Sequence, residues 1–145
     1  MKVTIIDGQG GKMGKLLIEQ IINAEINCEI TAVGTNSIAT SVMLKAGAGS
    51  GATGDNAVIV ACRNADIIVG PVGIVVADSL LGEISPAMAV AVGQSKAKKL
   101  LIPVNLCNNT IVGTASLSLS RLISEAVEHL GKLVSNRINA NNYYV

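Results

Sequence analysis

The residues best suited to chemistry form a glycine-rich turn near the start of this 145-residue sequence. The turn lies between a β-branched run at Val3–Ile6 and an apolar-striped segment at Lys12–Ala24, which predict a strand and a helix. Its candidate ligand-binding residues are Asp7, Gly8, Gln9, Gly10, Gly11, Lys12, Met13 and Gly14. Glycines let a phosphate approach the backbone, and a helix N-terminus offers unpaired N–H groups. The turn therefore predicts a nucleotide or phosphate site; the alternative is a tight connection that binds no ligand.

The glycine spacing distinguishes this turn from two common phosphate loops. The dinucleotide fingerprint has glycines at relative positions one, three and six, but Met13 stands at the sixth position counted from Gly8. The register that fits is Gly8, Gly11 and Gly14, three residues apart. A Walker A loop does not fit, because Leu16 stands where that motif needs a Ser or Thr for magnesium.

The segment Gly8–Gly14, with the sequence GQGGKMG, resembles the opening of dihydrodipicolinate reductases. The similarity is confined to Val3–Leu17. It implies that the three-spaced glycines bind NAD(P). The rest of the chain departs from that family, because it has neither a His-His pair with a nearby Lys nor a substrate domain.

The chain as a whole resembles a small bacterial family of uncharacterised Rossmann-like proteins. Four stretches carry this resemblance: GTN at 34–36, ATGDNA at 52–57, GPVGIV at 70–75 and LIPVN at 101–105. The resemblance implies a Rossmann-like fold and brings no activity with it.

Further candidate ligand-binding residues stand at the ends of predicted strands. NAD-type sites carry an acid after the second strand, whereas this chain has Thr35 and Asn36 there. Their side chains can bond a ribose or a phosphate, or they can cap the following helix. Gly70 and Pro71 end another predicted strand, at the edge where open α/β sheets bind ligands. Asp7 is the only acid at a strand end, and it can orient a ribose or accept bonds from loop N–H groups.

Other reactive side chains carry weaker signals, and no catalytic residue is assigned. Asp78 and Glu83 follow the third predicted strand and are interpreted as solvated surface acids. Cys107 has no histidine placed to activate it, so an inert thiol is expected. His129, the only histidine, flanks the last apolar stripe and is interpreted as a packed or interface residue. The scattered acids and single histidine argue against a transition-metal site.

Outside the turn, β-branched runs alternate with helical stripes. The predicted strands are Val3–Ile6, Glu29–Gly34, Ile67–Gly70 and Leu100–Val104, with a short edge strand at Thr110–Gly113. The predicted helices span residues 12–24, 37–45, 55–64, 86–95 and 119–134. This alternation predicts an α/β fold: a single three-layer Rossmann-like domain with a mainly parallel sheet of about five strands.

Three segments need separate interpretation. Residues 46–54 hold four glycines and are expected to form a mobile loop, which could act as a lid. Residues 55–64 are ambiguous between helix and strand; a helix capped by Thr53 or Asp55 is preferred. The Rossmann-like nucleotide-binding domain is expected to span residues 1–134, and the polar C-terminal tail at 135–145 is expected to fray.

Composition limits the classes of partner. Half of the residues are hydrophobic, 14% are charged, and Phe and Trp are absent, which suits a parallel sheet covered on both faces. A net charge of +1 without a basic stripe argues against nucleic acid as a partner. No apolar run reaches the roughly 18 residues of a membrane span. Three separated cysteines and the absence of a signal peptide predict a cytoplasmic protein. The apolar, striped last helix indicates a homo-oligomer, in the simplest case a homodimer.

Three functional hypotheses follow, in order of preference. The first is a module that binds NAD(P) or another nucleotide and has a sensing or regulatory role. The second is a small NAD(P)-linked oxidoreductase whose site is completed by oligomerisation, because the cofactor carries most of that chemistry. The third is a partner-binding protein that keeps the fold without a ligand.

Overall fold

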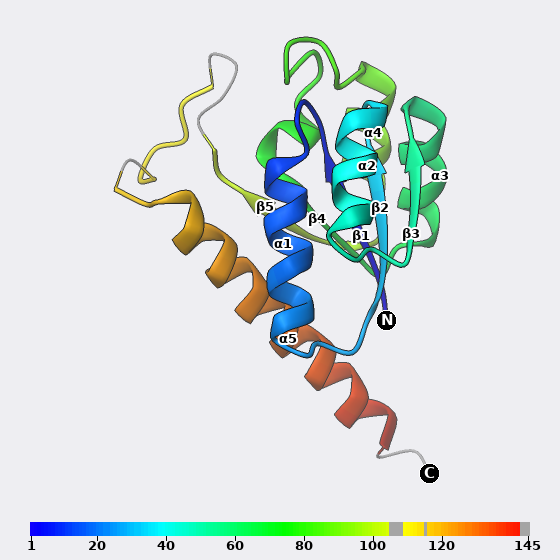
Figure 1. Ribbon diagram of the computed structural model, residues 1–145, viewed down its shortest axis with the longest axis vertical. Coiled ribbons are helices and arrows are strands. Elements are labelled where there is room, and N and C mark those ends of the chain that lie inside the picture. The colour runs from blue at the N-terminus through cyan, green and yellow to red at the C-terminus, as the bar shows by residue number, and fades with distance from the viewer. Residues whose placement is uncertain (105–108, 115, 143–145) are drawn as a thin grey trace.

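Five parallel strands form the central layer of a three-layer α/β fold (Figure 1). The computed structural model describes residues 1–104, 109–114 and 116–142. The strands are β1 (Lys2–Asp7), β2 (Glu29–Gly34), β3 (Ser50–Thr53), β4 (Ile67–Pro71) and β5 (Lys98–Ile102). The helices are α1 (Lys12–Asn23), α2 (Ser37–Lys45), α3 (Asp55–Asn64), the 3-10 helix η1 (Val72–Val75), α4 (Pro86–Gln94) and α5 (Leu119–Asn142). The predicted α/β class and parallel sheet are therefore confirmed.

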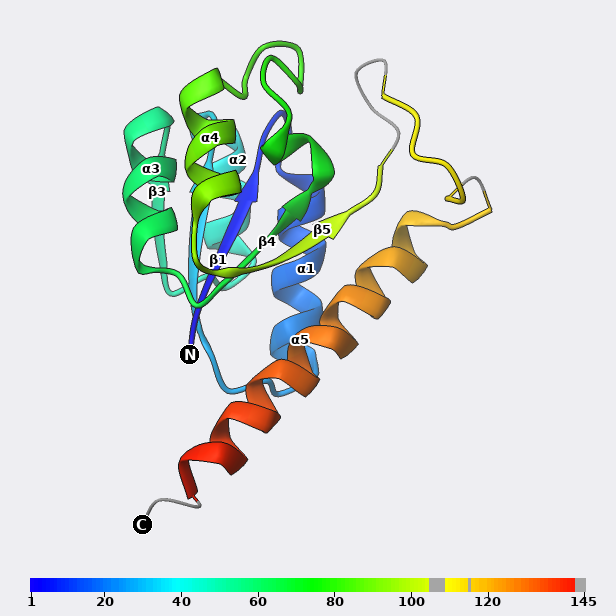
Figure 2. The same ribbon diagram turned by 180° about the vertical axis from the view of Figure 1, so that it is seen from behind.

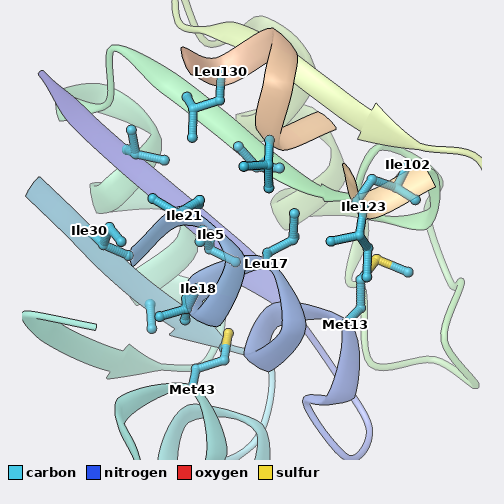
Figure 3. Packing of buried hydrophobic residues seen from close by; sticks show 14 of the residues in the cluster. Ile5, Met13, Leu17, Ile18, Ile21, Ile30, Met43, Ile102, Ile123 and Leu130 are labelled. Carbon is cyan, nitrogen blue, oxygen red and sulfur yellow. The ribbon is translucent and has the colours of Figure 1, made fainter. Parts of the chain in front are cut away.

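Two hydrophobic cores lie on opposite faces of the sheet. Side chains alternate along each strand, so Ile5 of β1 joins the core under α1, α2 and α5, whereas Ile6 joins the core under α3 and α4. Figure 3 shows the first core, where Leu17 of α1 lies near Ile5 and Ile123 of α5 lies between Met13 and Ile102. Figure 2 shows α3 and α4 covering the other face. Both faces of the central strands are buried, which explains why β1 and β4 are mainly apolar runs without alternation.

The order of the strands creates a crevice at one edge of the sheet. The order is β3-β2-β1-β4-β5, so the direction of winding reverses between β1 and β4. The chain leaves β1 towards α1 on one face and leaves β4 towards η1 on the other. In open α/β sheets, ligands bind at such a switch point, outside the carboxyl ends of the strands. The glycine turn after β1 and Pro71 at the end of β4 both lie there.

The glycine-rich stretch at 46–54 is partly a strand, which corrects the expectation of a mobile loop. Ser50–Thr53 pairs in parallel with Thr31–Gly34 at the edge of the sheet. All four residues of β3 are exposed, so no hydrophobic pattern marks them as a strand. Gly51 brings this edge close to α2, because a Cβ there would lie 2.9 Å from the Leu44 side chain.

Residues 55–64 form α3, so the preferred helix is confirmed, but its predicted cap is wrong. The N-cap is Gly54, at φ 95°, and it makes no side-chain cap bond. Thr53 instead exchanges a hydrogen bond of 2.7 Å with Thr40, and Asp55 accepts one of 2.5 Å from Ser85.

Two further boundaries differ from the sequence-based expectation. Thr110–Gly113 is not a strand: the described residues there form a turn, with Gly113 at φ 93°. The last helix, α5, continues to Asn142 and projects past the body of the protein, so most of the tail expected to fray is helical (Figure 1). Within the described residues, no helix is long and apolar enough to cross a membrane.

Candidate functional site

The buried carboxyl group of Asp7 holds the glycine turn in place through hydrogen bonds. Its side chain is only 6% exposed. One carboxylate oxygen accepts a hydrogen bond of 2.8 Å from the Gly8 N–H, and the other accepts one of 2.7 Å from the Gly14 N–H. The turn is closed by a bond of 2.9 Å from the Gly11 N–H to the Gly8 carbonyl. Of the two roles that the sequence left open for Asp7, the structure shows bonding to the turn.

The electrostatics of Asp7 reflect this buried position. Burial is the main cause that raises the pKa of its carboxyl above the ordinary value, and repulsion from Glu83 adds to it. Hydrogen bonds from the N–H groups of Gly14, Gly8 and Met13 act in the opposite direction but do not cancel the effect of burial. Asp7 is therefore a structural acid that takes up several of the donors at the start of α1.

The three-spaced glycines each have a packing reason. A Cβ at Gly11, which has φ 67°, would lie 2.8 Å from the Cα of Ala39 in α2. A Cβ at Gly14 would lie 2.8 Å from Cγ of Met43. A Cβ at Gly8 would lie within 2.7 Å of side-chain atoms from two other segments. Glycines at positions 8, 11 and 14 are thus needed because the turn packs closely against α2 and the neighbouring loops.

Gly10 and Lys12 differ from those three glycines. A Cβ on Gly10 would meet no atom within 4 Å. Within the described residues, the N–H groups of Gly10 and Lys12 make no hydrogen bond. The Lys12 side chain is exposed, and no acidic residue occupies the first turn of α1. As far as the described residues show, two backbone donors and an ammonium group are therefore available to an anion.

A cavity of about 400 Å³ opens beside this part of the turn, at the switch point of the sheet. The predicted site residues that line it are Asp7, Gly8, Gln9, Gly10, Gly11, Lys12, Met13 and Pro71. The other four, Gly14, Thr35, Asn36 and Gly70, lie outside it. Gly70 is needed for packing, because a Cβ there would run into the carbonyl of Ile6.

The far wall of the cavity comes from residues that the sequence analysis did not select. It is made mainly of apolar side chains after β5 and around the start of α5: Pro103, Val104, Thr114, Leu117, Leu119 and Leu122, with Leu80 from the loop before α4. Leu119 and Leu122 belong to the apolar stripe of the last helix, which the sequence had suggested as an oligomer contact or a part of the core and not as a wall of the site. The packing of α5 against α1 brings the start of that stripe to the same edge as the turn.

Glu83 is a side chain at the turn that the sequence interpretation did not place there. Its Oε2 atom accepts three hydrogen bonds: one of 2.7 Å from the Gln9 N–H, one of 3.1 Å from the Asn36 side-chain amide, and one from the Thr35 hydroxyl. Asn36 in addition caps α2 through a bond of 2.9 Å from the Ala39 N–H. Thr35 and Asn36, the candidates for a ribose, therefore face a carboxylate of the protein itself.

The loop that carries Glu83 is compact and conformationally strained. Asp78, Leu80 and Leu81 have φ values of 64°, 54° and 58°, in the left-handed region that non-glycine residues rarely adopt. The loop is nevertheless held firmly, because Leu80 is 3% exposed and Ile84 is 1% exposed. Such strain persists only where the surroundings fix it, and it is typical of ligand sites.

The environment of Glu83 keeps its carboxylate charged. Partial burial acts to raise the pKa, but the bonds from the Gln9 N–H, Thr35 and Asn36 outweigh it and lower the pKa below its usual value. The interpretation of Glu83 as a solvated acid is therefore wrong, although Asp78 is exposed as expected.

The remaining candidates lie away from the cavity. His129 is exposed on α5, so of its two expected roles the packed one is wrong, and a role at an interface stays a prediction. Cys107 lies outside the described residues. Among the described residues, no group of three or more His, Cys, Asp or Glu side chains is arranged to hold a metal ion.

Comparison with known proteins identifies a family and a similar fold. A search of curated proteins finds no match. Among solved structures, a dodecameric FMN-dependent UbiX-like decarboxylase from Escherichia coli O157:H7 is similar with a TM-score of 0.51 and 16% identity, over 96% of this chain and 95% of that one. The similarity of Gly8–Gly14 to dihydrodipicolinate reductases stays a prediction. The model of the family described as "Domain of unknown function (DUF3842)" matches residues 2–135, and the chain belongs to this family.

Proposed function

We propose that the protein binds a nucleotide-type ligand whose phosphate sits on the open side of the glycine turn. The observation that carries this proposal is a difference among the backbone N–H groups of the turn: some are hydrogen-bonded to protein carboxylates, and others have no partner among the described residues. The N–H groups of Gly8, Gln9 and Gly14 bond to protein carboxylates. Those of Gly10 and Lys12 make no bond within the described part of the chain, and they border the cavity.

The cavity suits the remainder of such a ligand. Its volume of about 400 Å³ lies in the range of small-molecule sites, about 300–1,000 Å³. Its far wall is apolar, through Leu117, Leu119 and Leu122, and its polar groups are concentrated at the turn. A ligand with one charged end and one apolar ring system fits this distribution.

The nature of the nucleotide is a separate question. The structurally similar decarboxylase is named as FMN-dependent, which adds a flavin mononucleotide to the candidates. NAD(P) is what the resemblance of Gly8–Gly14 to dihydrodipicolinate reductases implies. It gains less support, because Thr35 and Asn36 already bond to Glu83. Both nucleotide classes belong in a ligand screen.

A sensing or regulatory role fits the site better than catalysis does. Of the described residues that line the cavity, only Asp7 and Lys12 are titratable, and the Asp7 carboxylate is occupied by the turn. General acid–base chemistry needs a group within reach of the substrate proton. A small NAD(P)-linked oxidoreductase would therefore have to obtain further groups from a second copy of the chain. A partner-binding protein without a ligand is the third candidate.

The test is a binding screen with a matched pair of glycine variants. Ligands would be FMN, FAD, NAD⁺, NADH, NADP⁺, NADPH, AMP, ATP and inorganic phosphate. A ligand at about 100 times its dissociation constant adds about 2.7 kcal/mol, which raises the melting temperature by several degrees. Gly10→Ala should weaken binding at least about tenfold, or about 1.4 kcal/mol, because its methyl group stands where the phosphate approaches.

Gly93→Ala is the control, because a Cβ at that position in α4 also meets no atom within 4 Å. It should bind as the wild type does. The proposal fails if no ligand in the panel raises the melting temperature. It also fails if Gly10→Ala binds as tightly as Gly93→Ala in calorimetry, and the partner-binding hypothesis would then move to first place.

A further inference from the structure

We propose that Glu83 limits this site to ligands with a single phosphate, nucleotide monophosphates in the broad sense, and excludes dinucleotides. The inference rests on the proposed function and narrows its ligand class. Glu83 itself does not line the cavity. It acts from the other side of the turn, beside β2, where the second half of a dinucleotide would lie.

The first step concerns the path of a dinucleotide across this fold. Such ligands span the switch point, with the pyrophosphate on the turn after the first strand and one ribose at the end of the second. In this chain the end of the second strand is Gly34, followed by Thr35 and Asn36. A ligand that extends from Gly10 in that direction must pass Gln9 and reach those two side chains.

The second step concerns the donors on that path. The Gln9 N–H, the Thr35 hydroxyl and the Asn36 amide all donate to one oxygen of Glu83. A second phosphate beside Gln9 would find this N–H engaged and would lie next to the Glu83 carboxylate. Like charges placed together disfavour a wrong partner strongly, and exclusion of this kind is a common source of specificity.

The third step is that Glu83 lies in a loop whose conformation is fixed by buried side chains and backbone hydrogen bonds. Its loop is anchored by Leu80 and Ile84, which are buried. Backbone bonds of 2.8 Å from the Asp78 N–H to the Ile84 carbonyl and of 3.2 Å from the Ile84 N–H to the Ser79 carbonyl close it. Displacing the carboxylate by moving the loop would expose these apolar side chains. The charge is therefore a fixed feature of the free protein.

The fourth step is that the cavity side accepts one phosphate and then becomes apolar. Gly10 and Lys12 supply its donors and its charge. Beyond them the described wall is formed by Pro103, Val104 and the leucines of α5. A second phosphate directed this way would be buried against apolar side chains, which is unfavourable without partners. Both directions thus favour a monophosphate.

The experiment measures discrimination within two matched ligand pairs, FMN against FAD and nicotinamide mononucleotide against NAD⁺. In each pair the second ligand contains the first, joined to AMP. Calorimetry on the full chain should show the wild type binding at least one monophosphate about tenfold or more tightly than its dinucleotide. In Glu83→Gln, which keeps the size of the side chain and removes its charge, this ratio should fall at least about tenfold.

Glu29→Gln is the matched control, because Glu29 is exposed at the opposite end of β2 and the charge change is the same. Its ratio should equal that of the wild type. A wild type that binds FAD or NAD⁺ as tightly as the mononucleotide overturns the inference, whether or not the Glu83 variant folds. So does a folded Glu83→Gln protein with an unchanged ratio.

The proposed function and this inference fail in different ways. If neither mononucleotides, dinucleotides nor inorganic phosphate bind the wild type, the proposed function is wrong and the inference falls with it. If a dinucleotide binds well and Gly10→Ala abolishes that binding, the site stands and only the restriction by Glu83 is wrong.

Discussion

The two sides of the glycine turn use the same kind of backbone for opposite purposes. In the packed part of the turn, the N–H groups of Gln9 and Gly14 are bonded to Glu83 and Asp7, and a Cβ added at Gly8, Gly11 or Gly14 would collide with other segments. On the cavity side, Gly10 has open space and an N–H without a partner in the described chain. The comparison shows that a glycine-rich turn is not uniformly a ligand site. One half builds the connection, and the other half is available for recognition.

The largest effect should come from a change on the packed side. Gly11→Ala places a side chain at φ 67° and a Cβ 2.8 Å from the Cα of Ala39. The left-handed conformation costs about 1–2 kcal/mol, and crowding against the backbone of α2 adds about 1–3 kcal/mol. We expect a loss of about 3 kcal/mol in the free energy of unfolding, measured by urea denaturation, and a melting temperature lower by about 10 °C. A loss below about 1 kcal/mol would mean that the turn is not packed as described.

An intermediate loss of stability should come from removing the charge of Glu83, which accepts hydrogen bonds from the packed part of the turn. In the folded protein the pKa of Glu83 lies below its ordinary value of 4.5. Its contribution to stability is therefore fully present above that value and is lost as the pH falls through the lowered pKa. Glu83→Gln should be less stable than the wild type by about 1–2 kcal/mol near neutral pH, because bonds to a charged acceptor are stronger.

That difference should shrink as the pH is lowered below 4.5, the ordinary pKa of a glutamate. Asp7 acts with the opposite sign, since its pKa is raised above 3.8 and its protonated form is favoured by folding. Glu83 also helps to raise the Asp7 pKa, so the comparison of urea midpoints at several pH values reports the loss of the Glu83 charge together with the smaller change that this causes at Asp7. A stability difference that is constant across the pH range would contradict a charged, bonded Glu83.

Most of the fold was predictable because its elements bury periodic apolar residues. The run Val3–Ile6 lies within β1 (Lys2–Asp7), the run Glu29–Gly34 has the same bounds as β2, and α1 has a clear apolar stripe. The edge strand β3 was missed because its residues are all exposed and it depends only on pairing with β2. A strand at Thr110–Gly113 was predicted from local propensity, which does not show whether a neighbouring strand is available to pair.

The candidate site also has a part that the sequence could predict and a part that it could not. The turn from Asp7 to Met13 was predictable, because its chemistry is contained in one short segment between a strand and a helix. Glu83 was not, because it lies 74 residues from Gln9 in sequence and reaches it only through the fold.

The smallest effect on stability should come from Gly10→Ala, on the open side of the turn. Its size relative to the effect of Gly11→Ala shows whether the two parts of the turn differ. Gly10→Ala adds a methyl group that meets no atom within 4 Å. It also lowers the entropy of the unfolded chain, so we expect a change within about 0.5 kcal/mol in either direction by urea denaturation. The same substitution made one residue later, at Gly11, should cost several times more, although both residues belong to the same turn. If both variants lose similar stability, Gly10 is also a packing residue and the open side has no special status. If Gly10→Ala is stable and fails only in binding, its glycine is kept for a ligand and not for the fold.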